Sequence, residues 1–242
     1  MSGLLGVGGG IVMVPLLVAV AHLSQHQAHA TSLAAVVLMA AVGAATFGAD
    51  GQVDVGLAGL LAAGALFGAP LGARIMANTA EGNLKIAFGI FMLIVSGVLL
   101  GVDVRDPGTI GGVDITLPIA VGTVVFGVSI GLLSALFGIG GGVAMVPFMV
   151  LLLDRSPHLA EGTSLLVIIP TAVAGVIAHR KRGFVSFRHA GWLAVGGVFG
   201  AFAGARSALS IDEELLKLLF ALFLAVMGVR TIQQGWKVKR AT

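Results

Sequence analysis

The chain has 242 residues, of which 57% are hydrophobic and only 10% are charged. This composition excludes a soluble enzyme, a secreted disulfide scaffold and a nucleic-acid binder, and it predicts an all-α integral membrane protein. The formal net charge of +3 is a small basic excess confined to loops, so we interpret it as a topology signal. A membrane-spanning helix needs about 20 residues, so the length allows roughly eight to ten membrane segments.

Long apolar stretches mark most of the predicted helices. In chain order they are residues 31–47, 55–71, 84–100, 164–178, 191–205 and 215–229. A longer apolar run, residues 118–153, exceeds one ordinary span and contains Gly138-Ile139-Gly140-Gly141-Gly142. We expect a helix that enters the membrane up to about Phe137, a glycine break near mid-depth, and a short helix from Val143 to Leu153.

The two halves of the chain align without a gap at a spacing of 132 residues, the distance from Pro15 to Pro147. About 35 of roughly 97 aligned pairs are identical, which predicts two homologous helical repeats, each with a Gly-broken helix. The predicted division is a first repeat over 1–101, a linker over 102–116, a second repeat over 117–234 and a basic tail over 235–242. The helix that should precede the first break is mostly missing, so the first segment is expected to be truncated.

The paired glycine breaks are the strongest candidate for a binding site. Small residues let backbone N–H groups converge, and the helix that follows presents its positive dipole end, so such a segment attracts anions. Broken helices in corresponding places of two halves are typical of the substrate sites of secondary transporters. The other interpretation is that the glycines only allow close helix packing. The predicted substrate-binding glycines are Gly8, Gly9, Gly10, Gly140, Gly141 and Gly142.

Hydroxyl pairs recur near the start of the next predicted helix in each half. Thr31 and Ser32 match Thr163 and Ser164, and their hydroxyls can either cap that helix or donate to a bound oxyanion. We include all four among the candidate substrate-binding residues. Three prolines are expected to shape helices instead of contacting substrate: Pro15, Pro147 and Pro170.

Arg74 and Arg206 end the third predicted helix of each repeat. Both arginines can be interfacial residues whose side chains reach the lipid headgroups. The alternative hypothesis is that they form a gate or an entrance that attracts anions. His22, His26 and His29 recur at helical spacing, but no cysteine and few carboxylates lie nearby, so no metal site is predicted. No cofactor is expected either.

Basic residues crowd the loop at 179–188 and the C-terminus, and two spans separate the clusters, so both are expected on the cytoplasmic side of the inner (plasma) membrane. The matching loop of the first repeat has Asp50 and Asp54 and no basic residue, which hints that the repeats are inverted. Acidic residues are sparse within the predicted spans, so no buried carboxylate stands out as a relay for a coupling proton or sodium ion.

The twofold Gly-x-Gly-Gly-Gly motif, with a Pro five residues on and a Thr-Ser at the next helix, resembles the sulfite exporter TauE/SafE family of membrane permeases. The resemblance covers nearly the whole chain. It implies an inner-membrane transporter of two related halves that moves sulfite, organosulfonates or related small anions, with a homo-oligomer as a candidate assembly. It transfers no catalytic residue.

Two readings of function therefore remain. The first is a secondary transporter that binds a small anion at the two glycine breaks and works by alternating access. The second is a membrane structural or assembly module whose glycines serve helix packing alone. An intramembrane enzyme is not expected, because the chain has no HExxH motif, no paired carboxylates within the spans and no cysteine.

Overall fold

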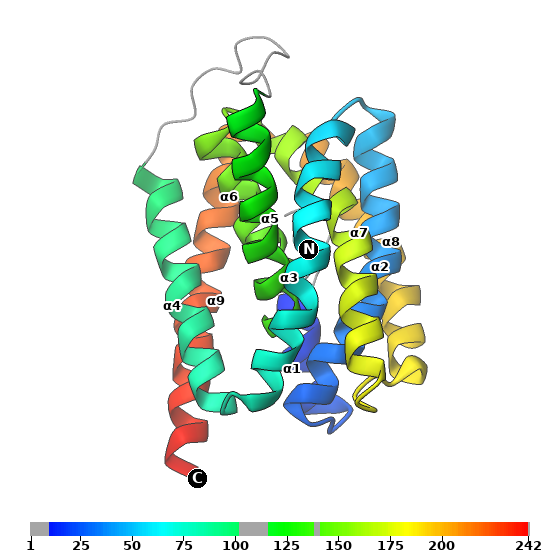
Figure 1. Ribbon diagram of the computed structural model, residues 1–242, viewed down its shortest axis with the longest axis vertical. Coiled ribbons are helices and arrows are strands. Elements are labelled where there is room, and N and C mark those ends of the chain that lie inside the picture. The colour runs from blue at the N-terminus through cyan, green and yellow to red at the C-terminus, as the bar shows by residue number, and fades with distance from the viewer. Residues whose placement is uncertain (1–9, 102–115, 138–140, 242) are drawn as a thin grey trace.

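The computed structural model describes residues 10–101, 116–137 and 141–241. Its nine helices in these ranges form one bundle of upright helices (Figure 1). Three of the predicted substrate-binding glycines lie outside the described residues, namely Gly8, Gly9 and Gly140. The helices are α1 (Gly10–Val20), α2 (Gln25–Ala49), α3 (Val55–Asn78), α4 (Glu81–Gly101), α5 (Leu117–Phe137), α6 (Gly142–Leu152), α7 (Pro157–Arg180), α8 (Phe187–Leu209) and α9 (Glu213–Ala241).

Seven of the described helices are long and apolar enough to cross a membrane, while α1 and α6 have 11 residues each. The chain is therefore an all-α, multi-pass membrane protein. Most helices extend beyond the predicted apolar stretches because polar caps lie outside those stretches. Ser24 caps α2 and Ser156 caps α7, each by accepting a backbone N–H bond three residues on. The predicted basic tail from 235 continues α9 without a break.

The local geometry repeats at the spacing of 132 residues. Four helix starts have counterparts at this distance, namely those of α1 and α6, α2 and α7, α3 and α8, and α4 and α9. Backbone conformations repeat too: His22 has φ 52° and Asp154 φ 51°, and Gly51 and Gly183 both have φ 72°. Left-handed φ is uncommon for residues other than glycine, so the His22–Asp154 match is specific.

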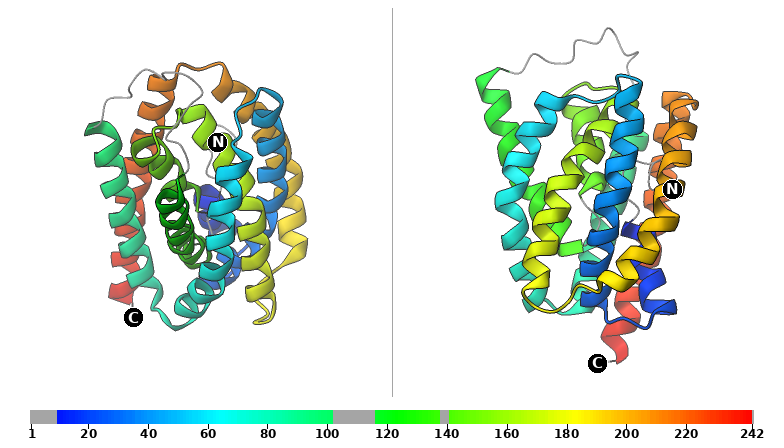
Figure 2. Two further views of the ribbon diagram at one scale, coloured as in Figure 1. Left: turned by 45° about the horizontal axis from the view of Figure 1, so that its top comes forward. Right: turned by 90° about the vertical axis from the view of Figure 1, so that its right-hand side faces the viewer.

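Corresponding helices run in opposite directions. The backbone N–H of Asp54, just before α3, donates to the Thr163 hydroxyl near the start of α7 (2.9 Å). At the other end of the bundle the N–H of Ser186, just before α8, donates to the Thr31 hydroxyl near the start of α2 (3.0 Å). Since α2 ends where α3 begins, α2 and α7 are antiparallel, as the views of Figures 1 and 2 agree. This is the inverted arrangement at which the acidic loop hinted.

Glycines set the closest helix contact, between α3 and α5. A Cβ added at Gly64, Gly68 or Gly72 would collide with carbonyl oxygens of α5, those of Val124, Val128 and Leu132 respectively. Backbones can approach this closely only where side chains are absent. The counterparts of the first two on α8, Gly196 and Gly200, have nothing within 4 Å of an added Cβ. Thus α8 has no neighbour equivalent to α5 among the described residues.

Candidate functional site

The first turn of α6 lies at mid-depth in the bundle. A Cβ added at Gly141 would be 2.7 Å from the Ile130 Cγ2 atom of α5. The next α5 residue, Gly131, faces the carbonyl oxygen of Ala65, which is near the middle of α3. From this level α6 extends to the end of the bundle at which α7 begins. A half-length helix therefore starts inside the span; the glycine break predicted just before it stays a prediction, because residues 138–140 lie outside the described residues.

Glycine is required at the start of α6. Gly141 has φ 87°, a left-handed conformation that other L-residues rarely adopt. Its carbonyl oxygen accepts the N–H bonds of Ala144 and Met145, which closes the first turn. Among the residues that the structure describes, no side chain caps this helix, although Gly142 and Val143 are buried. The first N–H groups of a helix have no partner within it, so a buried, uncapped start presents donors and a partial positive charge to whatever lies beside it.

The first repeat places Gly10 at the start of α1, the counterpart of α6. Both short helices pack on the long helix that follows each of them, α1 on α2 and α6 on α7. Pro147 lies within α6 and Pro170 within α7, and neither interrupts its helix. Pro15 likewise lies within α1, and whether these prolines shape the helices stays a prediction.

The Thr and Ser hydroxyls do not cap their own helices, because Ser24 and Ser156 have that role. The side chains of Thr31 and Thr163 are fully buried, and each joins its helix to the third helix of the other repeat. The two threonines therefore lie at opposite ends of the bundle. A substrate-binding role for them stays a prediction.

Each serine of these pairs follows its threonine and bonds back along its own helix. Ser32 donates to the His29 carbonyl and Ser164 to the Glu161 carbonyl, both at 2.8 Å. This is a common arrangement for a hydroxyl inside an apolar helix, where the nearest carbonyl oxygen lies one turn back. The role of both serines in substrate binding is likewise untested by these contacts.

Residues 123–242 match the family described as "Sulfite exporter TauE/SafE". Over 94% of the chain, the sequence is 30% identical to "Probable membrane transporter protein YdhB" of Bacillus subtilis (strain 168), of which it covers 93%. The chain belongs to the sulfite exporter TauE/SafE family. It is also similar to YunE of the same organism, another probable membrane transporter protein, with 27% identity over 97% of the chain and 93% of that protein.

A probable membrane transporter protein of Xylella fastidiosa (strain Temecula1) is 34% identical over 42% of the chain and 40% of its own length. The chain thus matches less than half the length of that relative. No solved structure matches the chain. All of these relatives are named probable membrane transporter proteins.

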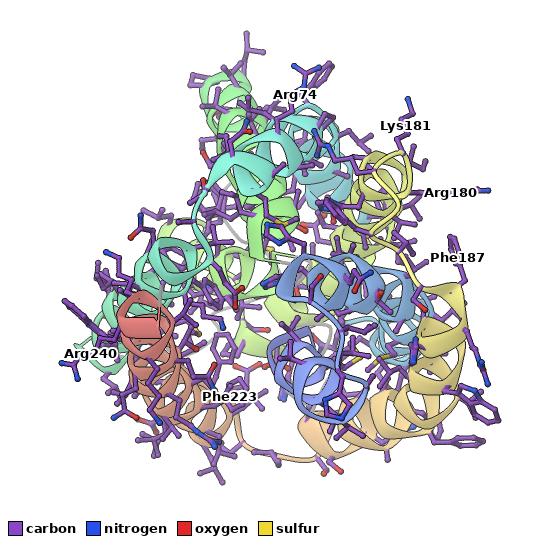
Figure 3. All side chains as sticks on the ribbon, turned by 90° about the horizontal axis from the view of Figure 1, so that it is seen from below. Arg74, Arg180, Lys181, Phe187, Phe223 and Arg240 are labelled. Carbon is purple, nitrogen blue, oxygen red and sulfur yellow. The ribbon has the colours of Figure 1, made fainter. Side chains whose placement is uncertain are left out.

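Several basic residues of this TauE/SafE protein gather at one end. Arg74, Arg180, Lys181 and Arg240 lie around the end of the bundle seen in Figure 3. The Arg180 guanidinium is 5.7 Å from the centre of the exposed Phe187 ring, a pairing suited to a membrane interface.

The two candidate gate arginines lie at opposite ends, because the repeats are inverted. Arg206 is 58% exposed and 3.5 Å from an Asp50 carboxylate oxygen, and Arg74 is also exposed. Exposure of both side chains favours the interfacial interpretation over a gate. Among the described residues, no group of three or more His, Asp or Glu side chains is arranged to hold a metal ion.

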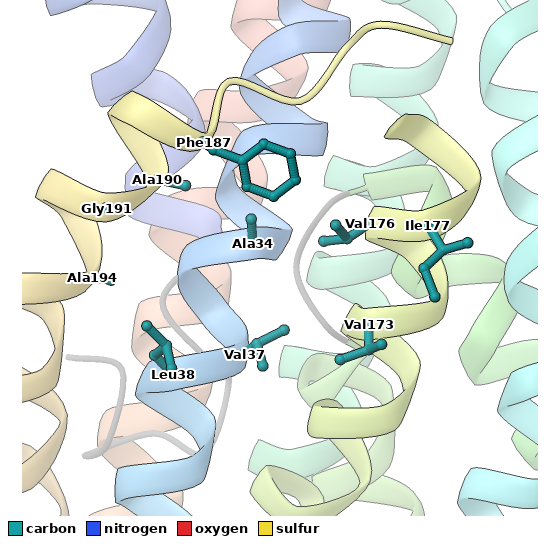
Figure 4. A pocket seen from close by; sticks show the side chains of 10 residues that line it. All are labelled: Ala34, Val37, Leu38, Val173, Val176, Ile177, Phe187, Ala190, Gly191 and Ala194. Atoms are coloured by element: carbon teal, nitrogen blue, oxygen red, sulfur yellow. The ribbon is translucent and has the colours of Figure 1, made fainter. Parts of the chain in front are cut away.

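An apolar groove of about 380 Å³ lies between α2, α7 and α8 (Figure 4). Leu38, Ile177 and Phe187 on its walls are each more than half exposed, so the groove opens on the outside of the bundle. Only apolar side chains line it, and it therefore offers an anion no side-chain donor. We assign no substrate to this groove.

Sequence reasoning missed one buried carboxyl. Glu161 is 1% exposed, although no buried carboxylate was expected within the spans. That expectation was wrong because the apolar stretch was taken to begin at Ser164, whereas α7 begins at Pro157. One signal in the sequence pointed to Glu161. Its counterpart at the spacing of 132 residues is His29, a second ionisable residue, which is also buried.

The hydrogen bond between Thr163 and Asp54 can be tested by mutation. Changing Thr163 to Val removes the acceptor of the Asp54 N–H, and leaving such a group unpaired costs about 1–3 kcal/mol. We expect a corresponding drop in the free energy of unfolding, measured by thermal unfolding in detergent. Thr163→Ser keeps the hydroxyl and should retain most of the stability. Unchanged stability in Thr163→Val would mean that the hydrogen bond to Asp54 contributes little at this position.

Proposed function

We propose that the chain is a secondary transporter of small anions such as sulfite and organosulfonates. One observation carries this proposal: α6 begins at mid-depth with a buried first turn that no described side chain caps. Backbone N–H groups and the positive end of a helix replace part of the water around an anion. The substrate class is suggested by the family's description, and the transport role by the names of the relatives.

The proposed site comprises the glycine segments of both repeats together with the Thr and Ser hydroxyls near them. Gly141 and Gly142 would supply the second-repeat half of the site, and Gly10 begins the helix of the first-repeat half. Several neutral donors bind an anion less tightly than a buried arginine would. A transporter benefits from this difference because it must release its substrate on the far side.

Alternating access fits the inverted arrangement. In the proposed cycle one repeat moves against the other, so that contacts separate at one end of the bundle while those at the other end hold. The Thr163–Asp54 and Thr31–Ser186 bonds join the repeats at the two ends and are candidates for these alternating contacts. The basic end, with the loop at 179–188 and the C-terminus, would face the cytoplasm, because cytoplasmic loops of inner-membrane proteins carry an excess of Lys and Arg.

Flux through reconstituted protein tests the proposal. Purified protein in liposomes should exchange labelled sulfite or sulfoacetate faster than protein-free liposomes, and excess unlabelled anion on either side should saturate the exchange. Adding either anion to detergent-solubilised protein should also raise the unfolding midpoint, since a ligand stabilises the state that binds it. If neither anion produces flux or stabilisation, the proposed substrate class is wrong, and the alternative of a packing module without transport gains support.

A further inference from the structure

Glu161 is a buried acid that the proposed anion site does not use. It lies in the second turn of α7, and one of its carboxyl oxygens, Oε2, is buried without a hydrogen-bond partner in the part of the chain that the structure describes. Ionisable groups inside a membrane span are costly and usually functional. A buried carboxyl group of this kind is stable only if it is paired with a cation or protonated.

The basic groups nearest in sequence are paired with other acids. Arg155, in the turn before α7, is 3.2 Å from an Asp54 carboxylate oxygen. His158 is 3.1 Å from Glu213, and its other ring nitrogen is 2.9 Å from a backbone carbonyl oxygen of α8. The charge of Glu213 on α9 has the same sign as that of an ionised Glu161.

Among the described helices that pack on α7, α9 alone brings a basic residue, Lys217, to this end. Neither α5 nor α6 contains an acidic or basic residue, and the histidines of α2 lie in its first turns, at the opposite end. Asp50 follows α2 at this end and faces Arg206 of α8. Lys217 lies one turn after Glu213 on α9. Glu161 therefore forms no ion pair with any described basic side chain.

An ionised carboxylate without a cation is strongly disfavoured inside a protein, whereas the neutral acid is tolerated. The packed arrangement therefore favours the protonated form of Glu161. The residues beside it close this end of the bundle. Gly162 packs on the backbone of Gln52, with no room for a Cβ, and Thr163 accepts the Asp54 N–H bond. If these contacts separate, water reaches Glu161 and the carboxylate can form.

We propose that Glu161 is a proton-binding site whose occupancy controls this end of the bundle. Closing the contact between α7 and the α2–α3 loop requires one proton, taken from water by the carboxylate; opening the contact returns that proton to water. The inference deepens the proposed transport function, since it makes the exchange of substrate at this end dependent on protons.

The chain has no cysteine, so a single introduced cysteine is the only thiol that a maleimide can label. Its labelling rate measures closure without any substrate. A maleimide reacts with Gln52→Cys at a rate that reports access to the α2–α3 loop. Asn78→Cys, exposed at the opposite end, corrects for the pH dependence of the thiol itself. We expect the corrected rate at Gln52→Cys to rise about tenfold from acid to alkaline pH. Adding Glu161→Gln should keep the rate low at every pH, because glutamine imitates the protonated acid.

Infrared spectroscopy of the purified protein gives a second readout. We expect the carbonyl band of a protonated carboxyl group at neutral pH, which Glu161→Gln removes and Glu214→Gln, an exposed control, leaves in place. The proposal is wrong if the corrected labelling rate at Gln52→Cys does not change with pH. It is also wrong if the infrared band of the protonated carboxyl group is still present in Glu161→Gln. Both results are independent of sulfite flux. Absent sulfite flux together with both expected results would refute the proposed substrate and leave the proton site supported.

Discussion

Changing Gly68 to Leu should be among the most damaging single substitutions in the bundle. The new side chain would collide with the Val128 carbonyl oxygen and lie 2.8 Å from the Leu132 backbone nitrogen. Backbone atoms cannot rotate away, so α3 and α5 must separate. We expect a loss of about 3 kcal/mol or more, which lowers the unfolding midpoint by about 6–12 °C. Thermal unfolding of the purified variant in detergent measures this shift.

The chain contains a matched control for this experiment. Gly200 occupies the same place in α8 that Gly68 occupies in α3, but it is exposed and nothing lies within 4 Å of an added Cβ. Gly200→Leu should therefore change the free energy of unfolding by no more than about 0.5 kcal/mol. If the two variants lose similar stability, the close contact between α3 and α5 is not what makes Gly68→Leu damaging.

Changing Gly141 to Ala should impair transport more than stability. A left-handed φ costs alanine about 1–2 kcal/mol, and the added Cβ would also meet Ile130. To relieve both, the first turn of α6 must shift, which displaces the backbone donors of the proposed anion site. Loss of one hydrogen bond to a charged ligand is worth about 1.5–3 kcal/mol. We therefore expect sulfite or sulfoacetate exchange in liposomes to fall by about tenfold or more.

Gly183→Ala separates backbone strain from the effect on the site. Gly183 also has a left-handed φ, 72°, but it lies in the α7–α8 loop with nothing within 4 Å of an added Cβ. We expect this variant to lose a similar 1–2 kcal/mol of stability and to exchange anions at the rate of the unchanged protein. Gly141→Ala with normal exchange would show that substrate does not bind at the start of α6.

The helices of the bundle were largely predictable from apolar periodicity. The helix before the break was expected to end near Phe137, and α5 does end there. The starts of α2 and α7 were missed by several residues, because their first turns contain His, Gln or Glu that a hydropathy argument places outside the membrane. These turns are helical because Ser24 and Ser156 cap them, which is a local signal that could have been used.

The role of the repeated threonines was harder to predict. From the sequence, Thr31 and Thr163 looked like caps or ligands for the helix on which they lie. Their hydroxyl partners are Ser186 and Asp54, which are 155 and 109 residues away in the chain. Nothing local in the sequence indicates such a partner, because it depends on how the two repeats are placed against each other.

Composition by itself determined that this protein is a helical membrane protein, and the internal spacing predicts two similar halves with a glycine segment in each. Apolar stretches of nearly 20 residues are long enough to span the bilayer as helices, whose backbone groups bond within the segment, so the helical membrane class needs no tertiary information. Only the tertiary structure decided that the halves are inverted, that Gly68 is packed while Gly200 is open, and that Glu161 is buried without a described ion-pair partner. Each of these depends on which helices become neighbours, and contacts between distant segments leave no periodic signal in either segment alone.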